Sequence, residues 1–324
     1  MNIMEDFAAL RRKGESSLRL LITGAWAGAE THIPEIAAMG HQVCFLGQER
    51  EALPCDPAWV EGAVCNGLFL HHPAEVFPNL RFVQLTSAGL DRVPADLLRQ
   101  RGVELRNARG VYSIPMAEFA LAGVLRLYKQ GDFFRRNQQR GVWEKNRDLR
   151  ELFGRTVTIL GCGSVGTECA RRFAAFGCRV LGVDLFPRTD APYQQIRPLK
   201  ELDRLLPETD ILVLTLPLTP ETRRLMDRAR LARLKPGAIL VNISRGGVTE
   251  EAALAAVLAE GRLSGAVLDV FETEPLPAES PLWAMENVVL TPHNSFVGEG
   301  NAARLDRLIL EALRELAGGQ TAGG

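Results

Sequence analysis

Short runs of apolar and β-branched residues recur along the chain, and longer segments with apolar residues at helical spacing lie between them. The short runs predict buried strands, and the longer segments predict amphipathic helices. A regular alternation of strand and helix favours parallel sheets covered by helices, which is the α/β class. Two such blocks appear, one in each half of the chain.

The first block has the more loosely spaced pattern. It predicts helices at residues 32–39 and 94–100, and strands at 18–23, 42–46, 81–85 and 103–105. The second block has a clearer pattern. It predicts helices at 165–176, 222–234, 250–260 and 301–316, and strands at 156–160, 179–184, 211–216, 238–243, 265–270 and 288–291.

A longer amphipathic helix is predicted at residues 114–129, between the two blocks. The polar stretch 130–150 follows it and is long for a simple connection. We interpret this stretch as a crossover between domains or as part of a subunit contact. Phe133, Phe134 and Trp143 are plausible apolar anchors for such a contact.

Length and composition narrow the class further. With 324 residues and about 100–200 residues per domain, two domains are expected. Apolar residues make up 46% and the net charge is −1, so neither nucleic acid nor an anionic membrane is an expected partner. No apolar stretch reaches a membrane span, no signal peptide is evident, and the six cysteines form no metal or disulfide pattern. A cytoplasmic protein without a bound metal is therefore expected.

A glycine-rich turn opens the second block. Gly161, Gly163 and Gly166 form a GxGxxG pattern that follows a predicted strand and begins a predicted helix. In that context the glycines allow a tight turn, close approach of a pyrophosphate, and close packing of helix on strand. The first N–H groups of the helix, around Ser164 and Val165, would bind the phosphates. A plain structural turn and an S-adenosylmethionine site are the alternatives.

An acidic residue ends the next strand. Asp184 lies 184 − 166 = 18 residues after the last glycine, where a carboxylate accepts hydrogen bonds from the ribose hydroxyls and repels the 2′-phosphate of NADP. The cofactor expected is therefore NAD, with NADP less favoured. Arg188 lies four residues further on and would soften that preference.

Three ionisable residues follow predicted strands of the second block: Arg245, Glu274 and His293. Ligands of open α/β sheets bind beyond the carboxyl ends of the strands, so these side chains are expected to converge. Reduction of a 2-keto acid needs a cation for its carboxylate and carbonyl, and an acid that protonates the carbonyl oxygen. Arg245 and His293 suit these roles, and Glu274 would stabilise the imidazolium.

Six motifs occur in an order that resembles the D-isomer-specific 2-hydroxyacid dehydrogenase family. They are the 161–166 loop, Leu216-Pro217-Leu218-Thr219, Lys235-Pro236-Gly237, the segment 242–247, the segment 268–276, and Thr291-Pro292-His293. The resemblance covers most of residues 80–295. It implies an NAD-dependent enzyme that interconverts a small 2-keto acid and a D-2-hydroxy acid, with Arg245, Glu274 and His293 as catalytic residues.

The resemblance also implies two parallel-sheet domains with the active-site cleft between them. A flavodoxin-like substrate domain would comprise residues 1–107 and 296–324, and a Rossmann-type coenzyme domain residues 108–295. Asp269 would support the site and contact the nicotinamide amide, and Leu216 and Pro217 would lie against the adenine. A backbone loop at Ser87, Ala88 and Gly89 would hold the substrate carboxylate, and Asn66 and Gly67 would face the substrate. A homodimer formed through residues 114–150 is expected.

Some positions depart from the family pattern or leave the function open. Phe119 replaces a frequent histidine, and Phe296 stands where small residues are common. His71 and His72 are interpreted as surface or hinge residues, with a substrate-side role as the alternative. Glu274 argues against a formate dehydrogenase, whereas phosphite oxidation would retain the same three residues. The main alternative is an NAD(H)-sensing binding protein on the same fold. The sequence identifies neither the 2-hydroxy acid nor the physiological direction.

Overall fold

The computed structural model describes residues 17–187 and 191–318, so Arg188 lies outside the described residues. The chain forms two compact units. One comprises residues 1–111 and 299–324, and the other residues 112–298. We call them the five-stranded unit and the seven-stranded unit after their sheets. In the described part of the chain, no helix is long and apolar enough to cross a membrane.

The five-stranded unit is built on one parallel sheet. Its strands are β1 (Arg19–Thr23), β2 (Gln42–Leu46), β3 (Gly62–Cys65), β4 (Phe82–Leu85) and β5 (Glu104–Arg106). Their spatial order is β2-β1-β3-β4-β5, and every pair is parallel. This order is the flavodoxin-like one, as predicted. The alternation of side chains along each strand places Leu21, Ala63 and Val83 in one apolar core.

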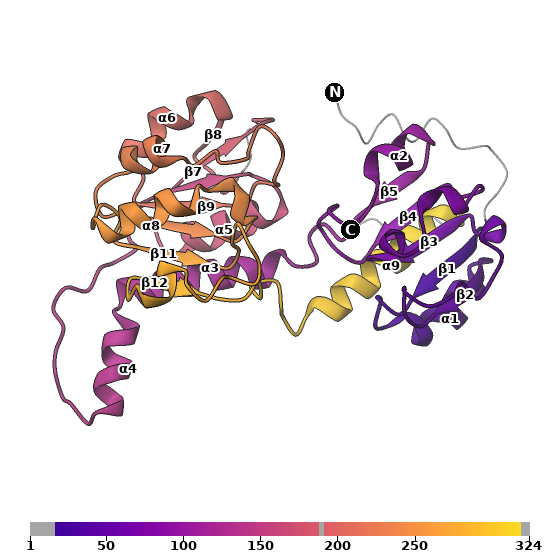
Figure 1. Cartoon of the computed structure of the whole chain (residues 1–324), viewed down its shortest axis with the longest axis horizontal. Helices are drawn as coiled ribbons and strands as arrows, with labels where there is room; N and C mark the ends of the chain where they lie inside the picture. Colours follow the sequence, from indigo (N-terminus) through magenta and orange to yellow (C-terminus); the bar gives the residue numbers. More distant parts are fainter. Residues whose placement is uncertain (1–16, 188–190, 319–324) are drawn as a thin grey trace. The chain divides into compact units, whose positions relative to one another are not determined.

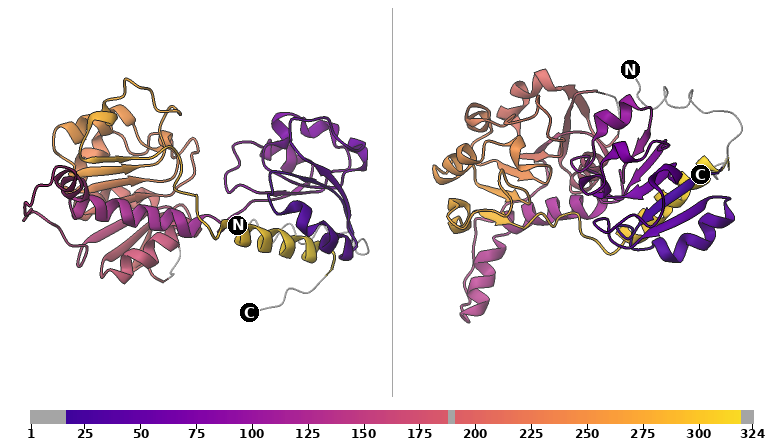
Figure 2. Two further views of the ribbon diagram at one scale, coloured as in Figure 1. Left: turned by 90° about the horizontal axis from the view of Figure 1, so that it is seen from below. Right: turned by 45° about the vertical axis from the view of Figure 1, so that its right-hand side comes forward.

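Helices α1 (Ala29–Ala38) and α2 (Ala95–Gln100) follow strands of this sheet, and α9 (Asn301–Leu316) returns to it from the end of the chain (Figures 1 and 2). Side chains at a spacing of four residues, Leu305, Ile309 and Leu313, form the buried stripe of α9. Two polar contacts fix the helix. Trp26 Nε1 donates to Asp306 Oδ1 at 2.6 Å, and His41 Nε2 contacts the carbonyl oxygen of Leu313 at 3.0 Å.

The seven-stranded unit is also entirely parallel. Its strands are β6 (Thr156–Leu160), β7 (Arg179–Asp184), β8 (Gln195–Pro198), β9 (Ile211–Leu214), β10 (Ile239–Asn242), β11 (Gly265–Leu268) and β12 (Val288–Leu290). The order is β12-β11-β10-β9-β6-β7-β8, a Rossmann-type arrangement in which β6 has β7 on one side and β9 on the other. The strand order reverses there, so the carboxyl end of β6 is the switch point at which such sheets bind ligands.

Helices cover both faces of this sheet (Figure 1). On one face α3 (Ser113–Tyr128) and α5 (Ser164–Ala175) enclose a core that includes Val157, Ile159 and Phe173. On the other face α6 (Leu202–Leu205), α7 (Arg228–Arg233) and α8 (Glu251–Ala259) enclose a second core. The packing of α3 is close, since a Cβ on Gly123 would lie 2.5 Å from Val267 Cγ1.

The polar stretch after α3 contains a helix that the sequence did not predict. This helix, α4 (Gly131–Gln139), extends away from the seven-stranded sheet in Figure 1. Phe134 is exposed on α4. Val142 and Trp143 follow the helix, where Val142 is exposed and Trp143 is 97% exposed. The segment therefore presents apolar side chains that no other part of the described chain covers.

The predicted helix 222–234 is wrong in its first half, because only Arg228–Arg233 is helical. The Thr222 hydroxyl instead donates to the carbonyl oxygen of Pro217 at 2.7 Å, and Arg224 adopts φ +50°, which ends any helix there. Strands β3 and β8 were not predicted. Every side chain of the four-residue β3 is buried, so this strand lacks the alternation by which half-buried strands are recognised.

Candidate active site

The 161–166 loop lies at the switch point and has the geometry of a phosphate-binding turn. Gly161 has φ +102°, which favours glycine. A Cβ on Gly166 would collide with the carbonyl oxygen of Gly161, whereas one on Gly163 would meet no atom within 4 Å. No side chain caps the first N–H groups of α5. The loop therefore offers open space and N–H donors at a helix N-terminus, which suits a pyrophosphate.

Asp184 ends β7 beside this loop. Its carboxylate accepts hydrogen bonds from the backbone N–H of Cys162 at 2.6 Å and of Phe186 at 3.0 Å. Each oxygen retains a further lone pair for a ribose hydroxyl. On the other side of the loop, a Cβ on Gly161 would lie 2.8 Å from Leu216 N, and Pro217 follows on the surface. The open turn, the Asp184 carboxylate and the adjacent Leu216 and Pro217 fit a dinucleotide cofactor.

His293 and Glu274 form a hydrogen-bonded pair in the same unit. His293 Nδ1 lies 2.9 Å from Glu274 Oε2, and the other carboxylate oxygen accepts the Phe271 N–H at 3.1 Å. The Nε2 atom of His293 has no partner among the described residues, so it is the nitrogen left for proton transfer. His293 also adopts φ +50°, an uncommon conformation that tends to occur at functional sites.

Asp269 holds the turn on which His293 stands. It is fully buried, at 0% exposure, and its carboxylate accepts the Thr291 hydroxyl at 2.6 Å and the N–H groups of Asn294 at 2.7 Å and Ser295 at 2.9 Å. A buried carboxylate needs donors of this kind. Its observed contacts support the turn, and its contact with the nicotinamide stays a prediction.

Arg245 follows β10 on a turn that Asn242 organises. The Asn242 side chain accepts the N–H and hydroxyl of Ser244 and donates to the carbonyl oxygen of Arg245 at 3.1 Å. A Cβ on the next residue, Gly246, would collide with the backbone at Phe271. The β10 and β11 loops therefore pack closely together, which brings Arg245 toward Glu274.

These side chains line one cavity of about 550 Å³ at the carboxyl edge of the sheet. Its lining includes Arg245, Glu274 and His293 together with Leu218, Arg223, Arg224, Gly246, Gly247, Phe271, Glu272 and Thr273. Phe296 packs its ring against that of His293, with centroids 6.2 Å apart and planes at 82°. The residues selected from three separate motifs thus meet in the structure, and Phe296 orients the imidazole.

The predicted substrate loops lie in the five-stranded unit. After β4, the Ser87 hydroxyl donates to the carbonyl oxygen of Gly89 at 3.1 Å, while the N–H groups of Ala88, Gly89 and Leu90 have no acceptor among the described residues. After β3, the N–H groups of Asn66 and Gly67 both donate to Glu49. Sequence reasoning missed Glu49, since an acidic residue after a strand gives no signal of the loop that it will contact.

The cysteines in the described residues are all free thiols. Burial raises the pKa of Cys169 to about 12 and that of Cys178 to about 11. Both thiols therefore stay protonated near neutral pH and are poor nucleophiles. His72 Nε2 contacts the carbonyl oxygen of Glu51 at 3.0 Å on the surface.

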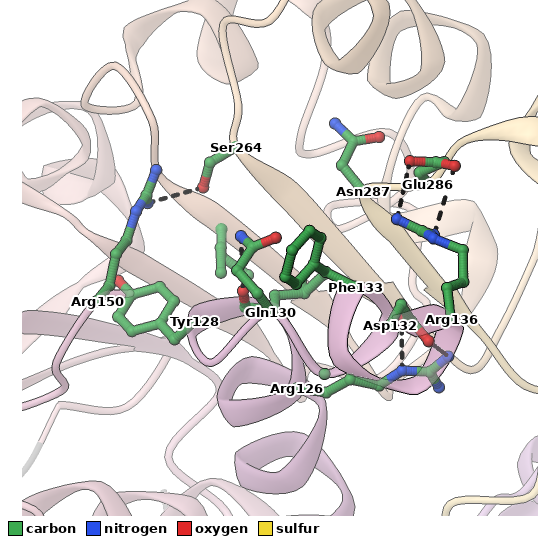
Figure 3. Close-up of a pocket in the computed structure, with 13 residues that line it drawn as sticks. Arg126, Tyr128, Gln130, Asp132, Phe133, Arg136, Arg150, Ser264, Glu286 and Asn287 are labelled. Atoms are coloured by element: carbon green, nitrogen blue, oxygen red, sulfur yellow. Dashed lines mark hydrogen bonds and ion pairs between the residues drawn. The ribbon is translucent and has the colours of Figure 1, made fainter. Parts of the chain in front are cut away.

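A second cavity, of about 230 Å³, lies at the opposite, amino edge of the same sheet (Figure 3). Its arginines are paired: Arg126 with Asp132 at 2.7 Å, and Arg136 with Glu286 at 3.4 Å. Arg150 donates to the Ser264 hydroxyl at 3.0 Å. None of the predicted site residues lines this cavity, and two of its three arginines are paired with carboxylates.

Comparisons with known proteins agree with this geometry. A sequence model described as "D-isomer specific 2-hydroxyacid dehydrogenase, NAD binding domain" matches residues 121–295. The (S)-sulfolactate dehydrogenase of Chromohalobacter salexigens is 34% identical over 244 residues, 75% of this chain and 79% of that protein. The glyoxylate reductase of Korarchaeum cryptofilum is 36% identical over 248 residues, 74% of this chain and 75% of that protein.

A solved structure extends the similarity to both units. The D-isomer specific 2-hydroxyacid dehydrogenase of Xanthobacter autotrophicus, in complex with NADPH and MES, superposes with a TM-score of 0.75 at 33% identity. The match covers 94% of this chain and 97% of that one.

Proposed function

Because the chain belongs to the D-isomer-specific 2-hydroxyacid dehydrogenase family, we propose that it is an NAD-dependent D-2-hydroxyacid dehydrogenase. Members of this family are oxidoreductases that act on the CH–OH group of 2-hydroxy acids. The observation that carries the proposal is the His293–Glu274 pair, at 2.9 Å, in the cavity that Arg245 also lines.

His293 is the proposed acid and base. In reduction, its Nε2–H donates a proton to the carbonyl oxygen of the keto acid, and in oxidation the neutral Nε2 accepts the hydroxyl proton. Glu274, on Nδ1, orients the ring and stabilises the imidazolium. Low pH therefore favours reduction, which consumes a proton, and high pH favours oxidation.

Arg245 is the proposed anchor of the keto acid. A guanidinium offers a planar pair of donors that matches a carboxylate and also polarises an adjacent carbonyl. The N–H groups of Ala88, Gly89 and Leu90 are proposed to hold the same carboxylate. Their lack of an acceptor among the described residues supports this role.

The cofactor is proposed to be NAD. The dinucleotide supplies or accepts the hydride when bound. The turn of Gly161, Gly163 and Gly166, with the N–H groups of Ser164 and Val165, would hold its pyrophosphate. Leu216 and Pro217 would lie against the adenine. Asp184 would accept the ribose hydroxyls and disfavour a 2′-phosphate. The relative from Xanthobacter autotrophicus was solved with NADPH, so this preference needs its own test.

The test is oxidation of NADH, and of NADPH in parallel, by the purified protein with glyoxylate, hydroxypyruvate, sulfopyruvate and a branched 2-keto acid. Turnover of at least one acid with NADH is expected. Asp184→Ala should lower the ratio of kcat/KM with NADH to kcat/KM with NADPH by about tenfold. Tight NADH binding without turnover of any acid would contradict the proposal and favour an NAD(H)-sensing binding protein.

We also propose that the protein is a cytoplasmic homodimer. The α4 segment exposes the aromatic residues Phe134 and Trp143, and also Val142, and exposed aromatic side chains are common anchors in interfaces. Light scattering should give the mass of two chains at micromolar concentration, and Trp143→Ser should shift it toward one. A wild-type protein that scatters as a monomer would contradict the dimer.

A further inference from the structure

The carboxylate of Glu49 joins the end of one strand to two loop positions at the carboxyl edge of the five-stranded sheet. Its Oε1 accepts the N–H of Asn66 at 2.7 Å and the hydroxyl of Thr23 at 2.9 Å, and its Oε2 accepts the N–H of Gly67 at 2.7 Å. Thr23 ends β1 and is completely buried. Glu49 thus connects the end of β1 to the loop that follows its neighbour in the sheet, β3.

This arrangement fills a site that would otherwise attract anions. Two successive backbone N–H groups directed at one carboxylate, one to each oxygen, form a bidentate, charge-assisted contact. A substrate carboxylate approaching Asn66 and Gly67 would have to displace Glu49 from it. The N–H groups of Ala88, Gly89 and Leu90, in contrast, have no acceptor among the described residues.

The carboxylate of Glu49 also packs closely against the loop at Gly67. A Cβ at residue 67 would lie 3.3 Å from Glu49 Oε2 and 3.4 Å from Leu70 Cδ1, so there is little room for the loop to shift. The side-chain amide of Asn66 makes no hydrogen bond with the described residues, and its Oδ1 is buried without a partner. The NH₂ group of the amide is therefore the part of Asn66 that remains available for another contact.

We propose that Glu49 is a positioning residue for substrate binding. It holds the backbone of Asn66 and Gly67, so that Asn66 serves the 2-keto acid through its side-chain amide, and the substrate carboxylate is left to Ala88, Gly89 and Leu90. This inference rests on the proposed dehydrogenase function. In this proposal Glu49 acts only through the loop that it holds.

The decisive variant is Glu49→Gln, which keeps the size of the side chain but places an NH₂ group against one of the N–H donors. With the best keto acid of the panel, KM should rise about tenfold while kcat stays within about twofold, because a charge-assisted contact that orders the loop is lost. The dissociation constant of NADH, measured by protein fluorescence, should not change. The matched control is Glu51→Gln. Among the described residues the Glu51 carboxylate accepts only the exposed N–H of Gln48, at 3.3 Å, so all three constants should stay at their wild-type values.

A second variant keeps the inference testable if Glu49→Gln folds poorly. Thr23→Val preserves the shape of a buried side chain and removes one of the three donors to Glu49, so KM should rise about two- to fivefold with kcat unchanged. An unchanged KM in a folded Glu49→Gln protein would overturn the inference, as would a fall in kcat alone. Failure of the wild-type protein to reduce any keto acid would instead refute the proposed function, before any variant is compared.

Discussion

The two edges of the seven-stranded sheet carry similar residues in different arrangements. At the amino edge, Arg126 and Arg136 are each paired with a carboxylate (Figure 3). At the carboxyl edge, a carboxylate is paired with one nitrogen of His293, and the other nitrogen has no partner among the described residues. Both edges have a charged cavity, and at the carboxyl edge the Nε2 atom of His293 is left for a substrate.

The difference follows from the topology of a parallel sheet. All strands point the same way, so the loops that follow β6, β7, β10, β11 and β12 gather at one edge and converge on a ligand. The loops that enter the strands meet at the other edge, where α4 begins and where paired charges attach it to the sheet. Charge and a cavity alone therefore do not identify a functional site.

The largest expected effect comes from His293→Ala at the carboxyl edge. Loss of the proton donor should lower kcat by roughly 10²–10⁴-fold, while NADH still binds with its wild-type dissociation constant. Steady-state kinetics and NADH fluorescence measure the two quantities. Arg136→Gln, at the amino edge, is the control and should leave kcat/KM within about twofold. Near-normal turnover by the His293 variant would remove this residue from the chemistry.

Arg245→Ala tests the same edge through binding rather than proton transfer. Loss of a charge-assisted, two-pronged contact with the substrate should lower kcat/KM by about 10²–10³-fold, with KM raised as well as kcat lowered. Arg245→Lys keeps the charge without the planar fork and should recover only part of that loss. Equal activity of the lysine variant and the wild type would mean that charge alone suffices.

The carboxyl edge was largely predictable from sequence. Gly161, Arg245 and His293 each belong to a short motif whose residues are close together in the sequence. Each motif also follows a strand with a recognisable apolar run. The placement of Arg245 and His293 in one cavity then follows from the parallel topology. The sequence pattern also predicted the fold class, confirmed by both sheets.

What the sequence could not predict depends on contacts between distant residues or on competing local bonds. Glu49 contacts Asn66 across 17 positions, and nothing in its neighbourhood marks that partner. Helix α4 is nine residues long, mostly polar and begins with a glycine, so its few apolar residues did not distinguish it from a polar connection. The false start of the helix at residue 222 arose because the Thr222 hydroxyl caps the preceding turn, which outweighs helix propensity.

Arg150→Ala tests the amino edge by stability. Arg150 donates to the carbonyl oxygen of Gly237 at 2.9 Å and to the Ser264 hydroxyl at 3.0 Å, and its guanidinium lies 5.5 Å from the centroid of the Tyr128 ring. The variant should lose about 1–3 kcal/mol of unfolding free energy, while kcat/KM at low temperature stays close to wild type. Thermal unfolding and kinetics on the same sample check both. A large loss of activity in a folded protein would mean that the two edges are coupled.

The smallest expected effect belongs to Asp132. The hydrogen bond from Arg126 holds the pKa of Asp132 below its ordinary value of 3.8, so the ionised carboxyl is favoured in the folded state. The contribution of this ion pair to the stability of the folded state is therefore present at pH values above 3.8 and is lost as the pH falls through the lowered pKa. Asp132→Asn should cost at most about 1 kcal/mol at neutral pH, and the difference from wild type should shrink below pH 3.8. Urea unfolding at several pH values measures this difference. The control is Asp96→Asn, because the wild-type Asp96 pairs with Arg99 but is 88% exposed.

A difference that does not change with pH would show that Asp132 acts through packing and not through its charge. The amino edge would then stabilise the unit without the ion pair that distinguishes it from the carboxyl edge.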